Sequence, residues 1–292
     1  MSDEGPGFFA DKHVAIFGLG LMGGSAARVL KGKCRRLTGI DPNPAVVQAA
    51  LLQKVVDRAD VQPGDLLVDV DLVILAAPVN SIVFLLSNLP SYCPNRAMVI
   101  DFGSTKKAIC EAMRTLPYRF DPVGGHPMCG KETSGLENAD PSLFKGAVFA
   151  LVALDRTSPV ARMTAEALVG LLGSHPLWLD AAVHDRHVAA TSHLPYLISN
   201  ALAFCTPVSA APLTATGFAS ATRLAGTSPD MMMDVLQTNR DAILASLHQY
   251  RDHLAMLENL LSTGDLTQLR YLLEAGSENR NRIEMFSKGD TL

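Results

Sequence analysis

The sequence predicts an α/β fold in which an N-terminal doubly wound domain of the Rossmann type is followed by an all-helical C-terminal domain. Two observations predict this order. In the first half of the chain, short continuous apolar runs alternate with helical stretches, which is typical of a parallel sheet covered on both faces. From about Ala181 onward, the apolar residues follow helical spacing almost throughout. A chain of 292 residues is long enough for two domains, and we place them at residues 1–155 and 156–292.

The strands expected in the first domain are its continuous apolar runs, which cover residues 13–18, 36–41, 71–78, 97–104 and 147–154. Helices are expected between them, beginning near Met22 and Pro44 and covering residues 80–88 and 105–115. We expect the glycine-rich segment DPVGGHPMCGKETSG, residues 121–135, to follow a strand as a tight functional loop.

The second domain is expected to contain a helix over 159–172 and then helices to the end, with breaks near Ala211, Ser228 and Gly264. Helical spacing continues through Pro195. Because proline lacks the N–H of a regular helix and costs roughly 3 kcal/mol in a helix interior, we expect a kink there. The final stretches, about 240–262 and 266–286, carry more apolar surface than one small bundle usually buries.

The composition argues against several classes of function. The 25 basic residues are scattered among 29 acidic ones, so no nucleic-acid partner is expected. The five cysteines form no CxxC pair, which favours reduced thiols, a cytoplasmic location and no structural metal. No apolar run approaches the roughly 18 residues that span a bilayer, and the acidic N-terminus lacks a signal-peptide core, so neither a membrane nor export is expected.

A dinucleotide-binding fingerprint follows the first expected strand. In GLGLMGGS, Gly18, Gly20 and Gly23 fit GxGxxG, and Leu21 and Met22 begin a helix. The first glycine allows a tight turn, the second allows a pyrophosphate to approach the backbone, and the third lets the helix pack on the strand. The helix N-terminus supplies N–H donors for the phosphates.

Asp41 strengthens this fingerprint, because it ends the second strand about twenty residues later, where a carboxylate binds the adenosine ribose. An acidic residue repels a 2′-phosphate, which favours NAD, whereas the nearby Arg35 and Arg36 leave NADP open. Ala77 and Pro78 end the strand at 71–78 on the same carboxyl edge, where ligands bind in open α/β sheets.

The catalytic side chains are expected at the same carboxyl edge of the sheet. Ser104 ends the strand at 97–104, and His126 lies in the glycine-rich segment, so the two should occupy adjacent loops beside a nicotinamide. Oxidation of an alcohol needs a group that takes the hydroxyl proton, and a neutral imidazole suits that task. His126 is therefore the candidate base.

Five segments together resemble the prephenate/arogenate (cyclohexadienyl) dehydrogenase family from about residue 13 to 285. They are GLGLMGGS, GSTK, GGHPMCGKETSG, HDRHVAATSHLPYLISNAL and GFASATRLAGTSPDMMMDVLQTN. The resemblance implies an NAD(P)-dependent oxidative decarboxylation in tyrosine biosynthesis, with prephenate or arogenate as substrate and a homodimer formed through the helical domain. The choice between the two substrates stays open, because they differ only by a keto or amino group.

The resemblance also implies roles for individual residues. His126 would bind the ring hydroxyl of the substrate and assist hydride transfer, and Ser104 would lie between cofactor and hydroxyl. Arg223 would bind a substrate carboxylate, while Ser192 and His193 would line the pocket. Tyr196 stands where many relatives carry a histidine, so substrate contacts there can differ.

For several other residues the sequence allows two different roles. Arg223 lies in an apolar, small-residue stretch, where its guanidinium would pair with a ligand carboxylate or tie two helices together. Lys131 and Glu132 would either bind substrate or pair with each other. His184 and His187 have metal-like spacing, yet without further ligands a solvated or helix-capping role is favoured.

The sequence argues against two rival functions. A β-hydroxyacid dehydrogenase has a similar plan but relies on a helical lysine, and residues 181–240 contain no lysine. A nucleotide-binding regulator without turnover would not need Ser104, His126 and Arg223 together.

Overall fold

The computed structural model describes residues 7–131 and 133–287. Its internal contacts divide the chain into two units, residues 1–242 and 243–292, each of which is described by itself. Among the described residues, no helix combines the length and apolar character needed to cross a membrane.

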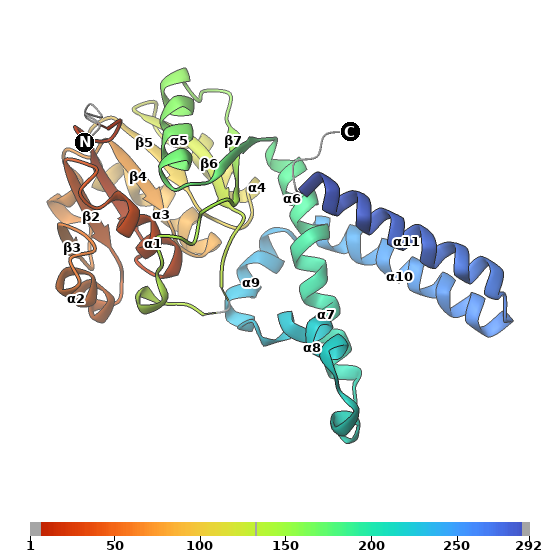
Figure 1. Cartoon of the computed structure of the whole chain (residues 1–292). Helices are drawn as coiled ribbons and strands as arrows, with labels where there is room; N and C mark the ends of the chain where they lie inside the picture. The colour runs from red at the N-terminus through yellow and green to blue at the C-terminus, as the bar shows by residue number, and fades with distance from the viewer. Residues whose placement is uncertain (1–6, 132, 288–292) are drawn as a thin grey trace, which may run out of the picture. The chain divides into compact units, whose positions relative to one another are not determined.

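The first unit is built on an eight-stranded sheet with the order β3-β2-β1-β4-β5-β6-β7-β8 (Figure 1). Neighbouring strands from β3 to β6 are parallel, β7 is antiparallel to β6, and β8 is parallel to β7. The first six strands have the order of the doubly wound dinucleotide-binding fold, so the predicted Rossmann-type domain is confirmed. The strands are β1 (His13–Phe17), β2 (Arg36–Ile40), β3 (Arg58–Asp60), β4 (Leu72–Leu75), β5 (Ala97–Asp101), β6 (Phe120–Pro127), β7 (Val148–Ala153) and β8 (His175–Trp178).

Helices cover both faces of the sheet, as the continuous apolar strands predicted. They are α1 (Leu21–Leu30), α2 (Pro44–Leu52), α3 (Val79–Tyr92), α4 (Lys107–Arg114) and α5 (Pro159–Leu171). Alternate residues of β1 belong to two separate cores: Val14 and Ile16 to one, Ala15 and Phe17 to the other. This alternation follows from the two-residue period of a strand, and it explains why both faces must be apolar.

The first part of the segment expected to be a loop, residues 121–127 around His126, is instead part of β6, so the prediction was wrong there. The described residues of 128–135 lie outside strands and helices, as expected. The glycines suggested a turn, but Gly124 and Gly125 lie inside the strand because neighbouring groups approach too closely for a side chain. A Cβ on Gly125 would lie 2.4 Å from the carbonyl oxygen of Asp101. Glycine inside a strand marks such a close approach. The strand therefore delivers His126 to the sheet edge on a regular, paired backbone.

The sheet also extends beyond the residues expected to form it. β3 was not predicted, because its three residues carry no apolar run. β8 pairs with β7 as far as Trp178, so the strand layer continues past residue 155, where the domain boundary was expected. α5 packs on β6, β7 and β8.

The rest of the first unit is helical. It contains α6 (Ala181–Val188), a π-helical turn η3 (Ala189–His193), α7 (Leu194–Cys205), the 3₁₀ turns η4 (Val208–Leu213) and η5 (Arg223–Gly226), α8 (Thr216–Thr222) and α9 (Pro229–Thr238). The π turn directly precedes Pro195, which lies in the first turn of α7. A wider turn at this point accommodates a proline that has no N–H to donate.

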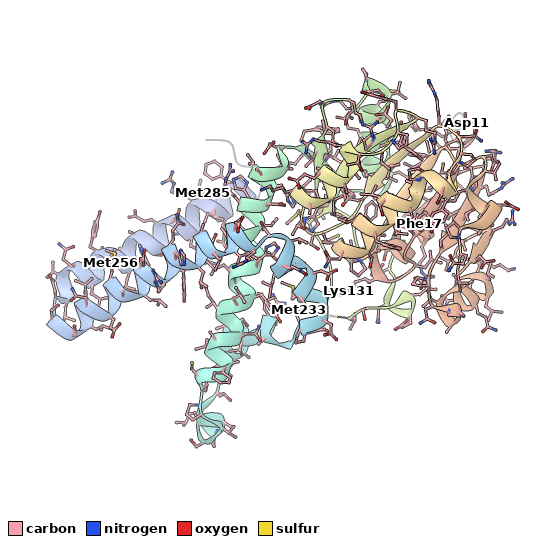
Figure 2. The ribbon with its side chains drawn as sticks, turned by 180° about the vertical axis from the view of Figure 1, so that it is seen from behind. Asp11, Phe17, Lys131, Met233, Met256 and Met285 are labelled. Atoms are coloured by element: carbon pink, nitrogen blue, oxygen red, sulfur yellow. The ribbon has the colours of Figure 1, made fainter. Side chains whose placement is uncertain are left out.

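The second unit is a helical pair, formed by most of α10 (Arg240–Thr263) and by α11 (Leu266–Ser287). Gly264 joins the helices with φ +70°, and the amide of Asp265 donates to the carbonyl of Leu260, as in a glycine-terminated helix C-cap. Met256 on α10 and Met285 on α11 are about half exposed, at 49% and 56% (Figure 2). The predicted all-helical C-terminal region is thus confirmed, including its break at Gly264.

Candidate active site

The loop between β1 and α1 has the shape that the three fingerprint glycines require. Gly18 has φ +87°, and a Cβ on it would lie 2.2 Å from the carbonyl oxygen of Ala76. A Cβ on Gly23 would lie 1.8 Å from the carbonyl oxygen of Gly18, so only glycine lets α1 approach the strand this closely. Gly20 differs, because no heavy atom lies within 4 Å of its Cβ position. That space is open to a phosphate.

A cavity of about 460 Å³ adjoins this loop at the carboxyl edge of the sheet. Its lining includes Gly18, Gly20, Asp41, Ala77, Pro78 and Phe84. Volumes of a few hundred Å³ are typical of small-ligand sites. The carboxylate of Asp41 accepts hydrogen bonds from the amides of Leu19 and Asn43, both at 2.9 Å. These bonds fix the carboxylate at the mouth of the glycine loop, where an adenosine ribose would meet it.

Arg35 and Arg36, which made NADP a possible cofactor, lie at the start of β2, at the opposite end of the strand from Asp41. Arg35 and Arg36 both form ion pairs with Asp69, at 3.2 and 3.0 Å. Arg36 begins β2 whereas Asp41 follows its end, so a strand length separates these guanidinium groups from the ribose-binding position. The arrangement favours NAD.

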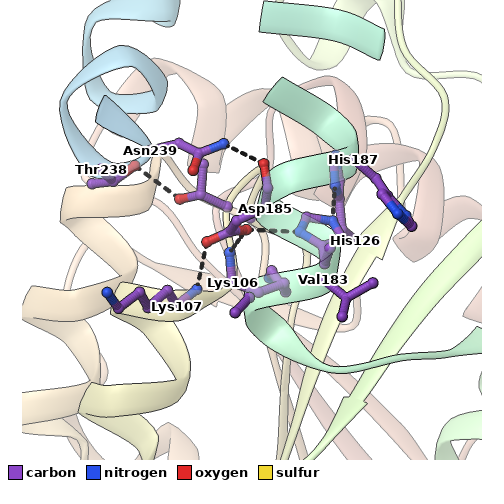
Figure 3. Close-up of polar contacts among 12 residues, drawn as sticks. Lys106, Lys107, His126, Val183, Asp185, His187, Thr238 and Asn239 are labelled. Atoms are coloured by element: carbon purple, nitrogen blue, oxygen red, sulfur yellow. Dashed lines mark hydrogen bonds and ion pairs between the residues drawn. The ribbon is translucent and has the colours of Figure 1, made fainter. Parts of the chain in front are cut away.

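A chain of side-chain hydrogen bonds begins at His126, the second-last residue of strand β6 (Figure 3). Its Nδ1 lies 2.9 Å from Nε2 of His184, and Nδ1 of His184 lies 2.8 Å from Oδ1 of Asp185. His184 and Asp185 come from α6 and are only 2% and 4% exposed. The sheet edge and the helical region therefore share one buried polar chain.

Asp185 is held from three sides. The backbone amides of Lys106 and Lys107 donate to its two carboxylate oxygens at 2.7 and 2.9 Å. The side-chain amide of Asn239 donates to its backbone carbonyl at 2.7 Å and lies 3.2 Å from Nδ1 of His193. Figure 3 shows these bonds converging on Asp185 from α4, α6 and the end of α9.

The electrostatics favour neutral imidazoles at His126 and His193 and an ionised carboxylate at Asp185. Burial, together with the neighbouring His184, Lys106 and His193, lowers the pKa of His126 well below its usual value of 6.5. Burial likewise lowers the pKa of His193 to about 4. Burial alone would raise the pKa of Asp185, but hydrogen bonds from His184 and the two backbone amides outweigh it and lower that pKa. A neutral His126 at pH 7 can accept a proton.

A second buried pair holds the end of β6. The ammonium of Lys106 donates to the carboxylate of Asp101 and to the carbonyl of Gly125, and both charged side chains are fully buried. Asp101 also accepts from the amides of Gly103 and Gly125, at 2.8 and 2.9 Å. Because Gly125 precedes His126, this network fixes the backbone that carries the imidazole.

The remaining predicted residues are spread over several elements. Ser104 is half-buried in the loop between β5 and α4, next to the strand that carries His126. Ser192 is exposed in η3, and His193 is buried there. Tyr196 is 6% exposed and packs in a small core with Met232 and Val235.

Arg223 is exposed where α8 ends and η5 begins. Lys131 is exposed and forms an ion pair with Asp140 at 3.1 Å. Glu132 lies outside the described residues.

Sequence reasoning missed four residues of the site: Lys106, His184, Asp185 and Asn239. His184 was expected to be solvated or to cap a helix, and this was wrong because its ring is buried against His126. Among the described residues, no group of three or more histidine, cysteine or acidic side chains is placed to hold a metal ion. The available signal was the HD pair at 184–185, two polar residues on the apolar face of an amphipathic helix.

Known families and structures match nearly the whole chain. The family model of the prephenate dehydrogenase nucleotide-binding domain matches residues 26–176, and that of the prephenate dehydrogenase dimerization domain matches residues 180–275. The prephenate dehydrogenase of Bacillus subtilis is 30% identical over 287 residues, covering 94% of this chain and 77% of that protein. The cyclohexadienyl dehydrogenase of Zymomonas mobilis is 28% identical, covering 92% and 94%.

Solved structures agree. A prephenate dehydrogenase from A. aeolicus, in complex with hydroxyphenyl propionate and NAD+, has a TM-score of 0.86 at 25% identity and covers 94% of this chain and 99% of its own. The arogenate dehydrogenase of Synechocystis has a TM-score of 0.81 at 29% identity, covering 93% and 99%. With both family models and these relatives spanning the sheet and the helical region alike, the chain belongs to the prephenate dehydrogenase family of NAD-dependent oxidoreductases.

Proposed function

We propose that the protein catalyses the NAD-dependent oxidative decarboxylation of prephenate to 4-hydroxyphenylpyruvate, a step of tyrosine biosynthesis. The observation that carries this proposal is the position of His126. A neutral imidazole stands at the carboxyl end of β6, beside the edge where β1, β4 and β5 form the nucleotide site. A base next to a hydride acceptor is what oxidation of a ring hydroxyl needs.

The chain's own residues account for binding and proton transfer. The glycine loop with Leu21 and Met22 at the start of α1, together with Asp41, Ala77 and Pro78, would hold NAD, which accepts a hydride from the substrate when bound. His126 takes the hydroxyl proton as the hydride leaves the ring carbon. Loss of the ring carboxylate as carbon dioxide then yields an aromatic phenolate, which takes the proton back from His126 to give the phenol. Orientation and charge stabilisation are therefore the protein's main tasks.

The other predicted residues would bind and orient the substrate. Ser104 would lie between cofactor and hydroxyl, and Arg223 would bind a carboxylate. Ser192, His193, Tyr196, Lys131 and Glu132 complete the proposed set. Its members come from both of the regions that we propose as the dinucleotide-binding domain (1–155) and the substrate-binding and dimerisation domain (156–292).

Arogenate is the second candidate substrate, because one structural neighbour at 29% identity is an arogenate dehydrogenase. The deciding experiment follows NADH absorbance and compares kcat/KM for prephenate and arogenate, each with NAD and NADP. We expect the highest value with prephenate and NAD. A higher value with arogenate would replace the proposed substrate, and no turnover with either would refute the function.

The His126→Asn variant tests whether His126 acts as the base. Turnover should fall by about 10²–10⁴-fold, the range for one acid–base group, while the Kd for NAD stays near the wild-type value. Fluorescence titration with NAD supplies that second measurement. Unchanged turnover would remove His126 from the mechanism.

Arg223→Ala tests the carboxylate contact. A charged hydrogen-bonded contact is worth about 1.5–3 kcal/mol, so KM for the substrate should rise by roughly tenfold or more. The effect on kcat should be smaller. If KM stayed at the wild-type value, the carboxylate would bind elsewhere.

The protein is further proposed to act as a cytoplasmic homodimer. Support comes from the dimerization-domain model over residues 180–275 and from apolar side chains left exposed on α10 and α11. Leu261, Leu266, Tyr271 and Leu273 are 59–68% exposed there, far more apolar surface than an isolated helical pair keeps in water. Size-exclusion chromatography with light scattering should give twice the mass of one chain. A monomer mass at all concentrations would contradict the dimer.

A further inference from the structure

We propose that His184 and Asp185 are positioning residues that fix the tautomer of His126, leaving its Nε2 unprotonated and able to accept a proton. This inference rests on the proposed function, in which His126 is the base. It assigns a role to two buried residues of α6 that are not among the predicted site residues.

The direction of the hydrogen-bond chain follows from Asp185. Its carboxylate oxygens accept from the backbone amides of Lys106 and Lys107, at 2.7 and 2.9 Å, and these amides can only donate. Both oxygens are thus engaged as acceptors, which favours the ionised carboxylate, and the same bonds lower the pKa of Asp185. An ionised carboxylate has no hydrogen to give to His184, so the 2.8 Å bond between them needs a hydrogen on Nδ1 of His184.

That hydrogen decides the state of the next two atoms. A neutral imidazole carries one hydrogen, so Nε2 of His184 is left with a lone pair. The 2.9 Å bond to His126 then needs a hydrogen on Nδ1 of His126. By the same count, Nε2 of His126 carries no hydrogen. With His184 neutral, each step follows from the one before it, and the first is set by two backbone amides.

A second proton on His184 would reverse the bond to His126 and place the hydrogen on the wrong nitrogen. The proposal therefore takes His184 as neutral. His184 is 2% exposed, and its two ring nitrogens are both engaged, with Asp185 and with His126. The tautomer spectra described below test this state directly.

The same chain has a second effect during turnover. When His126 takes the hydroxyl proton it becomes a cation whose Nδ1–H donates to His184. His184 in turn donates to the Asp185 anion, so the positive charge is stabilised across two hydrogen bonds in a buried setting. A carboxylate that orients an imidazole and stabilises its cation acts in this way in serine proteases.

The first test reads the tautomers directly, without substrate. Long-range ¹H–¹⁵N spectra of the ¹⁵N-histidine-labelled protein at neutral pH distinguish the two neutral forms, with His126→Asn and His184→Gln used to assign the signals. We expect the Nδ1–H form for both residues. An Nε2–H form at His126 would overturn the proposal, whatever reaction the protein catalyses.

The second test asks whether His184 and Asp185 act through His126. His184→Gln and Asp185→Asn should each lower kcat by at least about tenfold, less than the 10²–10⁴-fold typical of losing the base itself, with the Kd for NAD unchanged. Added to His126→Asn, His184→Gln should lower kcat no further, since residues that act as a unit are not additive. Independent, multiplicative losses would indicate a merely structural role and refute the proposal.

His187→Gln is the matched control. His187 lies on the same helix, three residues beyond His184, but its ring is exposed. It should keep wild-type kcat. The outcomes also separate this inference from the proposed function: if His126→Asn abolishes turnover while His126 is in the Nε2–H form, only the positioning role fails. If His126→Asn retains turnover, the base itself is misassigned.

Discussion

The nucleotide cradle and the His126 network lie at the same edge of one sheet but are built in opposite ways. The cradle is made by backbone, from Gly18 to Gly23, with one carboxylate from the next strand. The network is made by side chains that come from β5, β6, α4, α6 and the end of α9. A site made by backbone can be recognised in a short stretch of sequence, because it requires glycines at fixed spacing. A network of side chains that are far apart in the sequence gives no such local pattern.

The largest expected effect concerns the network. Lys106→Met leaves Asp101 buried and without its cation, and breaking a buried ion pair in this way costs about 3–5 kcal/mol. Urea unfolding should show a loss of that size. Lys107→Met, at the exposed neighbouring position, should change stability by less than about 0.5 kcal/mol. Equal effects for the two lysines would mean that the buried pair does not hold β6.

The nucleotide cradle should be disturbed by side-chain atoms added to its glycines. Gly23→Ala places a Cβ 1.8 Å from a backbone oxygen, so α1 has to shift, at a cost of about 1–3 kcal/mol or more. Gly20→Ala meets no protein atom within 4 Å and should leave the unfolding free energy nearly unchanged while weakening NAD binding. Thermal unfolding and NAD titration of both variants measure the contrast. Destabilisation by Gly20→Ala would show that this space serves the fold and not a ligand.

Asp41 is the one side chain on which the cradle depends. Asp41→Asn removes the charge that binds a ribose and repels a 2′-phosphate. The ratio of kcat/KM for NAD to that for NADP should fall by roughly tenfold, the value of about 1.4 kcal/mol at one contact. An unchanged ratio would place the source of the NAD preference elsewhere.

The last effect is a pH dependence in the network. With its pKa at about 4 in the folded state, His193 binds fewer protons than in the unfolded chain, where the value is near 6.5. Its stabilising contribution is therefore complete above about pH 6.5 and is lost as pH falls toward 4, by about 1.4 kcal/mol per pH unit. His193→Gln should flatten the slope of unfolding free energy against pH by that amount, and His187→Gln should not. Identical slopes for wild type and His193→Gln would contradict a neutral, buried His193.

The success of the sequence-based predictions differs in the same way between the glycine cradle and the His126 network. The Rossmann-type sheet, the glycine loop and the helical pair at 240–286 all rest on local periodicity or local glycine spacing, and each was predicted. β6 was missed because glycine inside a strand has the same appearance in sequence as glycine in a turn; only the Asp101 carbonyl, twenty-four residues away, reveals the difference. His184 was misread because its partner His126 is 58 residues distant.

The two amide bonds from Lys106 and Lys107 to Asp185 also bear on how a ligand gains access. They tie the start of α4, just after Ser104, to helix α6, so these two elements are held together beside His126. Parting them would strand a buried anion, a cost of several kcal/mol. Any movement that admits substrate is therefore expected to leave the contact between α4 and α6 intact.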